Sequence, residues 1–450
     1  MNTNPIPGFS RPENWSKLTA DGRIKCRLDR WEQGVDIAFK SPEAKVAYQQ
    51  RVRVLRDAIE LKNPQKRVPA IPIIGMHLTK RAGLTTIDVL HHYDKLLQPI
   101  LDYHREFQPD VLFPSGPLPG KVWEILDYKV YAWAGHGLPD GHQYQTKEGE
   151  YMTADDYPWL IRDPSAFWMK RYLPRVFGAL EPMRKMASLP SITEILSIAP
   201  AVMPFGMPDV QMMLQKLMEA GNEAMKAFQA TQQIAGAVAG EGFPMLLGPP
   251  FATIPFDMIG DVMRGTVGIM KDLYQRPDYL IAACERLVPI VINDMVEACD
   301  RMDRNFVTIP LHKGADVFMS DAQYKKFYWP ILRAVMEGLN NEGIVPLLFA
   351  EGSYNKRLEI IADYPKGRVI WFFDQTDMRK VKEILGGQQC VKGNIPSSLM
   401  TVGSIDQLRK YCLDLLELFS DTGGFILANG AVVDYTTDEH LRTLIEVVRQ

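Results

Sequence analysis

The 450-residue chain is poor in cysteine, carries almost no net charge and has no long apolar run. Its formal net charge of −3 gives no reason to expect a nucleic acid or an anionic membrane as a partner. No run reaches the roughly 20 apolar residues that a membrane span requires. A thiolate metal site is not encoded locally, because no CxxC or HxC pair includes any of the five cysteines Cys26, Cys284, Cys299, Cys390 and Cys412.

Signatures of several common enzyme classes are also missing. The sequence has no GxxxxGK[ST] phosphate loop, no GxGxxG after an apolar strand and no GxSxG nucleophile elbow. The first residues, MNTNPIPGFSRPENW, have neither the basic start nor the apolar core of a secretory signal. With the unpaired cysteines, this N-terminus leads us to expect a reduced, cytoplasmic protein.

What the sequence does contain is a regular alternation of apolar segments and helical patterns. Eight apolar segments begin near positions 68, 110, 243, 306, 344, 368, 390 and 424. The segment IVPLLFAEG at 344–352 is apolar without polar alternation, which is typical of a parallel strand buried on both faces. Eight strands that alternate with helices predict an α/β fold, specifically a closed (β/α)8 TIM barrel.

Two regions fall outside this alternation. Residues 1–66 are charged and mostly helical in pattern, which predicts an N-terminal helical extension and leaves 67–450 for the barrel. Residues 117–241 far exceed the usual connection of about 2–6 residues, so we expect a mostly helical insertion after the second strand. The methionine-rich segment 207–221 favours packing against the barrel, with a lid or a homodimer surface as the alternative.

Polar residues follow the C-terminal ends of the predicted strands, where α/β barrels carry their chemistry. Glu351, directly before Gly352, is the first candidate for catalysis, together with His312 and Asp374. Glu351, His312 and His77 could instead bind a divalent metal ion. We expect substrate contacts from His77, Arg81, Ser115, Tyr354, Asn394 and Asn429. Each residue could equally cap a helix or pair with a neighbour, and capping competes most directly at Asp374 and Asn394.

Several segments resemble the uroporphyrinogen decarboxylase superfamily. The clearest are GPPFATIPFDMIGDVMRG at 248–265 and VKGNIPSSLMTVGSIDQL at 391–408, with KNPQKRVPAIPI at 62–73 and GGFILANG at 423–430. The similarity covers about 60 to 450, and it is weakest in the insertion. It implies a (β/α)8 barrel and an enzyme that acts on a small-molecule substrate.

Two branches of that superfamily differ in their site residues. Decarboxylases carry an RQAGR-like segment whose arginines hold substrate carboxylates, whereas GMHLTKRAG here keeps only Arg81. Corrinoid-linked methyltransferases carry an HxCG segment and a later cysteine that hold zinc. The matching positions here are Phe349, Glu351 and about Ala431. The resemblance therefore implies a divergent member of the superfamily. The overall arrangement of its segments is most similar to that of the methyltransferases, but it lacks the residues for their thiol-activating zinc.

Three hypotheses follow. The first is a methyltransferase working with a corrinoid on a separate protein, because no corrinoid-ligating DxHxxG motif occurs in this chain. The second is a decarboxylase or lyase of a carboxylated substrate, with Arg81, Arg264 and Lys313 as candidate carboxylate anchors. The third is a catalytically silent barrel that binds a ligand or a partner, and the polar groups at the predicted mouth argue against it.

Overall fold

A five-stranded parallel sheet forms the centre of the computed structural model, which describes residues 8–62, 67–113, 116–187, 193 and 195–449. The strands follow the chain order β4-β5-β6-β7-β8, so a helix-containing crossover joins each neighbouring pair. Their bounds are β4 (Phe306–Leu311), β5 (Val345–Ala350), β6 (Ile370–Phe373), β7 (Cys390–Ile395) and β8 (Phe425–Asn429).

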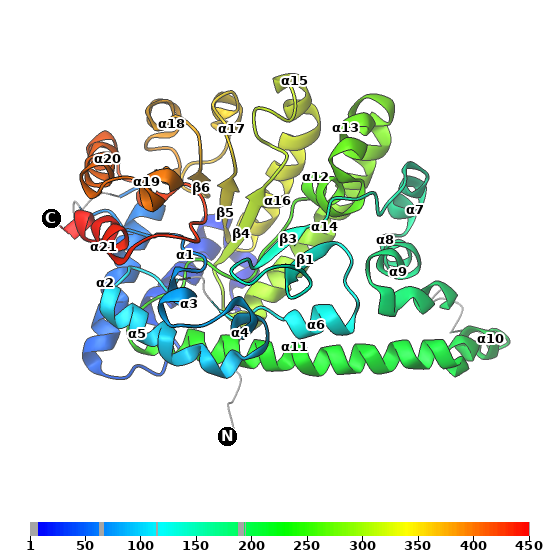
Figure 1. The fold of residues 1–450 in the computed structure, drawn as a ribbon. Coiled ribbons are helices and arrows are strands. Elements are labelled where there is room, and N and C mark those ends of the chain that lie inside the picture. The colour runs from blue at the N-terminus through cyan, green and yellow to red at the C-terminus, as the bar shows by residue number, and fades with distance from the viewer. Residues whose placement is uncertain (1–7, 63–66, 114–115, 188–192, 194, 450) are drawn as a thin grey trace.

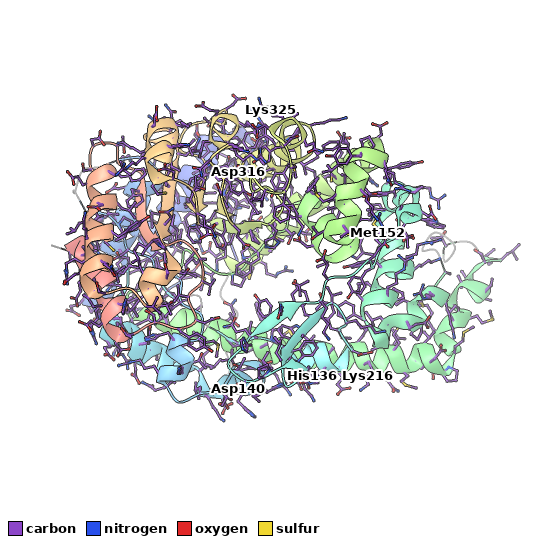
Figure 2. The ribbon with its side chains drawn as sticks, turned by 45° about the horizontal axis from the view of Figure 1, so that its top comes forward. His136, Asp140, Met152, Lys216, Asp316 and Lys325 are labelled. Atoms are coloured by element: carbon purple, nitrogen blue, oxygen red, sulfur yellow. The ribbon has the colours of Figure 1, made fainter. Side chains whose placement is uncertain are left out.

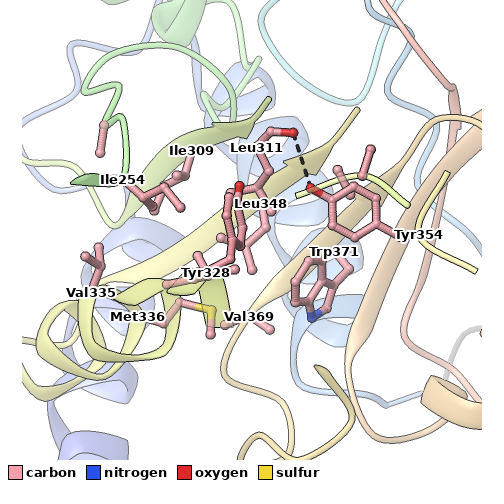
Figure 3. Packing of buried hydrophobic residues seen from close by; sticks show 14 of the residues in the cluster. Ile254, Ile309, Leu311, Tyr328, Val335, Met336, Leu348, Tyr354, Val369 and Trp371 are labelled. Atoms are coloured by element: carbon pink, nitrogen blue, oxygen red, sulfur yellow. Dashed lines mark hydrogen bonds between the residues drawn. The ribbon is translucent and has the colours of Figure 1, made fainter. Parts of the chain in front are cut away.

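The strands are buried on both faces, as the unbroken apolar segments predicted. Because successive strand residues point to opposite faces, Leu347 and Phe372 join an inner cluster, whereas Leu348 and Trp371 join a larger outer one. Figure 3 shows the outer cluster packed against the helical layer, which contributes Tyr328 among others. The sequence thus predicted an α/β fold with a parallel sheet, and that prediction is confirmed.

Helices surround this sheet in the C-terminal half of the chain (Figure 1). They are α12 (Pro255–Met258), η8 (Ile259–Met263), α13 (Gly265–Gln275), α14 (Pro277–Met302), α15 (Asp321–Gln323), η9 (Tyr324–Tyr328), α16 (Trp329–Asn341), α17 (Leu358–Ile361), α18 (Met378–Leu385), α19 (Ser397–Thr401), α20 (Ile405–Leu418), α21 (Asp438–Glu446) and η10 (Val447–Arg449).

Three of the eight predicted strands, at 68–76, 110–116 and 243–248, are not regular strands in the part of the chain that the structure describes. The first of them still approaches the sheet, because Ala70 forms a parallel bridge with Leu427 of β8. Proline limits the hydrogen-bonded ladders of the first and third segments, since it has no N–H to donate. These prolines are Pro69, Pro72 and Pro244.

Apolar side chains of the same three segments nevertheless pack into the inner cluster. Ile71, Val111 and Leu246 lie in one cluster with Leu347 of β5 and Ile426 of β8. The three segments therefore share a core with the sheet although they add no regular strand to it. A fully hydrogen-bonded, closed eight-stranded barrel is not present among the described residues.

The N-terminal segment packs against the same core. Thr19 and Ser41 cap its two long helices, each accepting a hydrogen bond from a backbone N–H of the first turn. Leu28 and Leu55 from these helices reach the inner cluster. The helices before the insertion are η1 (Trp15–Lys17), α1 (Ala20–Gln33), α2 (Pro42–Ile59), α3 (His77–Arg81), α4 (Thr86–His91), η2 (Tyr93–Lys95) and α5 (Leu97–Phe107).

The segment 117–241 contains a small sheet that the sequence analysis missed, ordered β2-β1-β3. Its longest element, α11 (Pro208–Gly240), packs along α5 and α6 (Figure 1). Met212 and Met218 are exposed on α11, and the homodimer suggested for their segment stays a prediction.

The elements of the insertion are α6 (Gly120–Ile125), β1 (Tyr131–Ala134), β2 (Gly137–Leu138), β3 (Tyr144–Thr146), η3 (Ala154–Asp156), α7 (Tyr157–Arg162), α8 (Pro164–Phe167), η4 (Trp168–Tyr172), α9 (Leu173–Val176), η5 (Gly178–Lys185), α10 (Ile198–Val202), η7 (Met203–Gly206) and α11. Among the described residues, no helix combines the length and the apolar character needed to cross a lipid bilayer.

Candidate functional site

A cavity of about 630 Å³ lies between the C-terminal end of β4 and the insertion. Figure 2 labels Asp316 in the loop after β4 and His136 between β1 and β2, which belong to the two parts of the chain that meet at this cavity. The residues that line the cavity are Tyr131, Thr146, Glu148, Trp168, Tyr172, Thr253, Met258, Asp261, Val262, Thr266, His312 and Lys313. Strand ends of a parallel α/β sheet are the usual place for a ligand, so we place the candidate site here.

A second cavity, of about 240 Å³, lies between α1, α11 and the start of β4. Three of its charged residues pair with one another, because Arg30 Nε lies 3.0 Å from Asp303 Oδ2 and Arg30 Nη2 lies 2.6 Å from Asp36 Oδ2. This cavity lies at the N-terminal end of β4, away from the C-terminal strand ends where α/β sheets usually bind ligands.

His312 is the central polar residue of the site. Its Nδ1 lies 2.5 Å from Asp261 Oδ2, and its Nε2 lies 3.7 Å from Glu351 Oε1. Lys313 Nζ lies 3.1 Å from the other oxygen of Asp261. The imidazole is therefore held on one side by a carboxylate and leaves Nε2 directed toward Glu351 at the cavity.

Asp257 fixes the backbone beneath this cluster. Its buried carboxylate accepts the N–H groups of His312 at 2.9 Å and Lys313 at 3.0 Å, and the Tyr328 hydroxyl donates to it at 2.8 Å. Burial, followed by the charge of Asp261, raises the pKa of Asp257 to about 7. This network holds the first two residues after β4 in place.

The charges of the cluster favour a protonated histidine. Burial lowers the pKa of His312, but the hydrogen bond and the charge of Asp261 outweigh it and raise that pKa to about 9. Burial also raises the pKa of Glu351, and the charge of His312 opposes that rise. At neutral pH, His312 is therefore an imidazolium that can donate a proton.

Glu351 lies near His312, and Asp374 lies beside the turn that follows Glu351. The Glu351 side chain is 42% exposed, but it contacts the cavity only through His312, since it is not among the lining residues. Asp374 accepts a hydrogen bond from the N–H of Gly352 at 3.1 Å, and burial raises the pKa of its carboxyl group. Asp374 therefore supports the turn that carries Glu351.

Tyr354, a predicted substrate contact, is fully buried instead. Its hydroxyl donates to the carbonyl oxygen of Leu311 at 3.2 Å, the bond drawn in Figure 3. The aromatic ring packs in the outer cluster. Tyr354 thus stabilises the end of β4 through this hydrogen bond and does not line the cavity.

Both predicted asparagines bind backbone groups. The Asn394 side chain donates to the carbonyl oxygens of Asp374 at 2.9 Å and Thr376 at 2.7 Å. Asn429 accepts from the N–H of Ile73 at 2.7 Å and donates to the carbonyl oxygen of Ile73 at 2.8 Å. Their amides join neighbouring strand ends, which is a structural role.

His77 and Arg81 lie on α3 and contact a different group of residues. The His77 imidazole pairs with the hydroxyl of Tyr103 at 2.6 Å and with Asp438 at 3.2 Å. Arg81 pairs with Asp438 at 2.9 Å and with Glu106 at 2.8 Å. No contact in the described part of the chain joins either residue to His312. Ser115, also predicted as a substrate contact, lies outside the described residues.

The donor arrangement does not fit the predicted metal site. His77 is engaged by Tyr103 and Asp438, so it does not meet His312 and Glu351. Among the residues that the structure describes, no group of three or more histidine, cysteine, aspartate or glutamate side chains is arranged to hold a metal ion. We therefore derive no chemical step through a bound metal.

Sequence reasoning missed Asp257 and Asp261. Both lie in the segment 248–265, four residues apart on the helical stretch formed by α12 and η8. Residues four apart lie on one helix face, so this spacing was a usable signal. The aromatic side chains that the insertion contributes to the cavity had no comparable signal, because nothing in the sequence places the insertion over β4.

The fold and the site define an α/β enzyme with polar groups at the C-terminal end of a parallel sheet. The family model for uroporphyrinogen decarboxylase (URO-D) matches residues 210–450, which is more than half of the chain. The chain therefore belongs to the URO-D family. A methyltransferase from Methanosarcina mazei has a similar fold, with a TM-score of 0.56 and 16% sequence identity over 90% of this chain and 98% of that one. No curated protein matches the chain in sequence.

Proposed function

We propose that this URO-D family enzyme is a methyltransferase that removes a methyl group from a heteroatom of a small molecule. The observation that carries the proposal is the position of His312, which lines the cavity and lies between Asp261 and Glu351. A corrinoid bound to a separate protein would supply the nucleophile that accepts the methyl group.

The chain's own residues would activate the methyl donor. Protonated His312 is placed to donate a proton from Nε2 to the heteroatom as its bond to the methyl carbon breaks, so the demethylated product leaves neutral. Asp261 stabilises the imidazolium before transfer and keeps the ring oriented. Glu351 can return a proton to His312 between turnovers. General acid catalysis of this kind contributes roughly 10²–10⁴ to a rate.

Two features support a partner-borne corrinoid. The chain has no DxHxxG segment, so it lacks the common local sequence for holding a corrinoid itself. Thr146 and Glu148 are exposed at the edge of the cavity, which leaves it open to an approaching protein. The residues at 349, 351 and about 431 are Phe349, Glu351 and Ala431, which do not fit a thiol-activating zinc site.

The decarboxylase alternative has less support from the geometry. Such an enzyme needs cations that are free to hold substrate carboxylates. Arg81 pairs with Asp438 and Glu106, and Arg264 Nε lies 2.6 Å from Asp272 Oδ2. Of the three candidate anchors only Lys313 lines the cavity, and Asp261 already pairs with it.

The test is methyl transfer from a panel of O-, N- and S-methylated small molecules to free cob(I)alamin, followed by the visible spectrum of methylcobalamin. The wild-type protein should methylate cobalamin with at least one donor, and His312→Asn should not. His92→Asn is the matched control, because His92 is an exposed histidine away from the cavity lining. Release of CO2 from carboxylated compounds, with no methyl transfer from any donor, would contradict the proposal.

A further inference from the structure

An arginine without a partner lines the second cavity, the one of about 240 Å³ beside the start of β4. Arg304 Nε is buried and makes no hydrogen bond, and no carboxylate in the described part of the chain forms an ion pair with this guanidinium. A desolvated charge is costly unless it is paired. We propose that this cavity binds a small organic acid, whose carboxylate pairs with Arg304 and whose apolar chain fills the remaining space. The site is separate from the one proposed for methyl transfer, because His312 follows the opposite end of β4.

The end of α14 positions Arg304 in this cavity. The helix ends at Met302, and Asp303 follows it with a left-handed φ of 50°, which turns the chain toward the sheet. The N–H of Arg304 then donates to the carbonyl oxygen of Cys299 at 2.9 Å. β4 begins two residues later, at Phe306. The backbone that carries the guanidinium is therefore fixed by the helix on one side and by the sheet on the other.

Four charged residues line the cavity, and their charges sum to zero. Arg30 pairs with both Asp303 and Asp36, so each of these carboxylates already has a cation. Burial lowers the pKa of Arg304, which means that the nearby Tyr48 and Asp303 do not replace the hydration that its guanidinium has lost. An acid that pairs with Arg304 therefore does not have to displace either aspartate.

A second donor lies close to Arg304. The charge of Arg304 acts on the hydroxyl of Tyr48, which also lines the cavity and is 3% exposed. Burial raises the pKa of Tyr48, so its hydroxyl stays protonated and can donate a hydrogen bond. A carboxylate accepts from both groups, whereas an ammonium would be repelled by Arg304 and has no lone pair to accept from either one.

The rest of the cavity favours an apolar chain. Leu246, Leu247 and Phe306 line it and belong to the inner cluster of the core. Ala38 and Gly236 are exposed lining residues, so the cavity opens to solvent. Its volume lies below the roughly 300–1,000 Å³ of typical small-molecule pockets, which favours a short chain.

Isothermal titration calorimetry on the full-length protein tests the site with three probes. They are hexanoate, acetate, which has the carboxylate without the chain, and hexylammonium, which has the chain with the opposite charge. We expect hexanoate to bind more tightly than either of the others. A hydrogen bond to a charged group contributes about 1.5–3 kcal/mol, so Arg304→Gln should weaken hexanoate binding by roughly 10- to 150-fold. Arg301→Gln is the matched control, because Arg301 is an exposed residue of α14 that does not line the cavity.

A thermal melt separates the loss of a ligand contact from the loss of the fold. Without ligand, Arg304→Gln should melt at or above the wild-type temperature, since it removes a desolvated charge that has no partner. Hexanoate should raise the melting temperature of the wild type and leave that of the variant unchanged. Ala239→Leu, which fills the cavity from α11 and keeps Arg304, should also abolish binding.

The inference is overturned if hexanoate does not bind, or if acetate or hexylammonium binds as tightly. It is also overturned if Arg304→Gln or Ala239→Leu binds hexanoate as Arg301→Gln does. A ligand-free Arg304→Gln variant that melts below the wild type would contradict it as well, because the guanidinium would then have a partner within the protein.

Discussion

The two sides of the cavity are built from different parts of the chain and hold their side chains by different means. On the sheet side, Asp261, His312 and Lys313 are fixed by hydrogen bonds and opposite charge. On the insertion side, Tyr131 and Trp168 are fixed mainly by packing against other rings. The first group carries the charged, titratable side chains and the second offers mainly aromatic surface, so under the proposed function reaction chemistry and substrate selection would be separated in space.

The family match includes the sheet side of the cavity and excludes the insertion side. Residues 210–450 match the URO-D family model, and they include the three titratable residues of the sheet side. The aromatic residues of the insertion that line the cavity, Tyr131, Trp168 and Tyr172, lie outside that match. An insertion that carries the substrate contacts can change while the strand ends keep their chemistry. The following predictions test whether the two sides are as separate in function as they are in structure.

The largest effect should come from His312→Asn. Asparagine is polar but cannot donate a proton to a leaving heteroatom, so we expect turnover to fall by roughly 10²–10⁴. The fold should persist, because the backbone N–H at 312, which Asp257 binds, is unchanged. Turnover and a thermal melt of the variant provide the check. A fully active variant would remove His312 from the mechanism, whatever its pKa.

Glu351→Gln should come next, with a loss of roughly 10² at the lower end of the general acid–base range. Glutamine keeps the shape of the side chain but cannot return a proton to His312, which lies 3.7 Å away. A stopped assay against the donor used for His312→Asn measures the loss. Glu285→Gln, an exposed change on α14, is the control. Normal turnover together with a normal melt would make Glu351 merely structural.

Asp261→Asn should shift the pH profile more than it changes the maximum rate. Asp261 raises the pKa of His312 to about 9, so the imidazolium persists up to that pH and is lost above it. Without the carboxylate that pKa should fall toward about 6.5, the ordinary value for histidine. The alkaline limb of the rate profile should therefore move to lower pH, with the largest loss near pH 8. An unmoved limb would show that His312 is not the titrating acid.

The two sides also differ in how far the sequence predicted them. The apolar segment at 344–352 and its polar end placed Glu351 correctly beside His312, because a strand buried on both faces is readable from composition alone. His77 was wrongly grouped with them, since its segment is not a regular strand and α3 turns the side chain toward Tyr103. The end of a strand can be predicted from the residues around it, whereas the partner of a side chain depends on segments that are distant in the sequence.

The insertion was less predictable for the same reason. Its small sheet pairs Tyr131 with Thr146, a contact between segments that carry few β-branched residues and no strict alternation. The position of Trp168 and Tyr172 at the cavity depends on how η4 packs against η8, which is decided by contacts such as that of the Tyr172 hydroxyl with the carbonyl oxygen of Val262. No pattern within 117–241 predicts that packing, so the insertion side of the cavity became known only from the structure.

The smallest effect concerns Lys392 of β7, a polar residue of the sheet that contacts neither side of the cavity. Its amine is fully buried, lies 3.3 Å from the centre of the Phe372 ring and has no hydrogen-bond partner among the described residues. The ring face favours an ammonium, but burial without an acceptor outweighs it and lowers the pKa of Lys392 well below its ordinary value. Methionine fills a similar volume and packs well on aromatic rings.

We therefore expect Lys392→Met to raise the free energy of unfolding by about 1–3 kcal/mol, since it removes an unsatisfied buried donor. The folded-state pKa is depressed, so below the unfolded pKa of about 10.4 the unfolded chain binds more protons and wild-type stability rises with pH. The advantage of the variant should shrink as the pH rises toward that value. Urea denaturation of both proteins at pH 7 and pH 9.5 measures this, with Lys380→Met on the exposed face of α18 as the control. A variant that is less stable at both pH values would mean that Lys392 has a partner that the sheet alone does not provide.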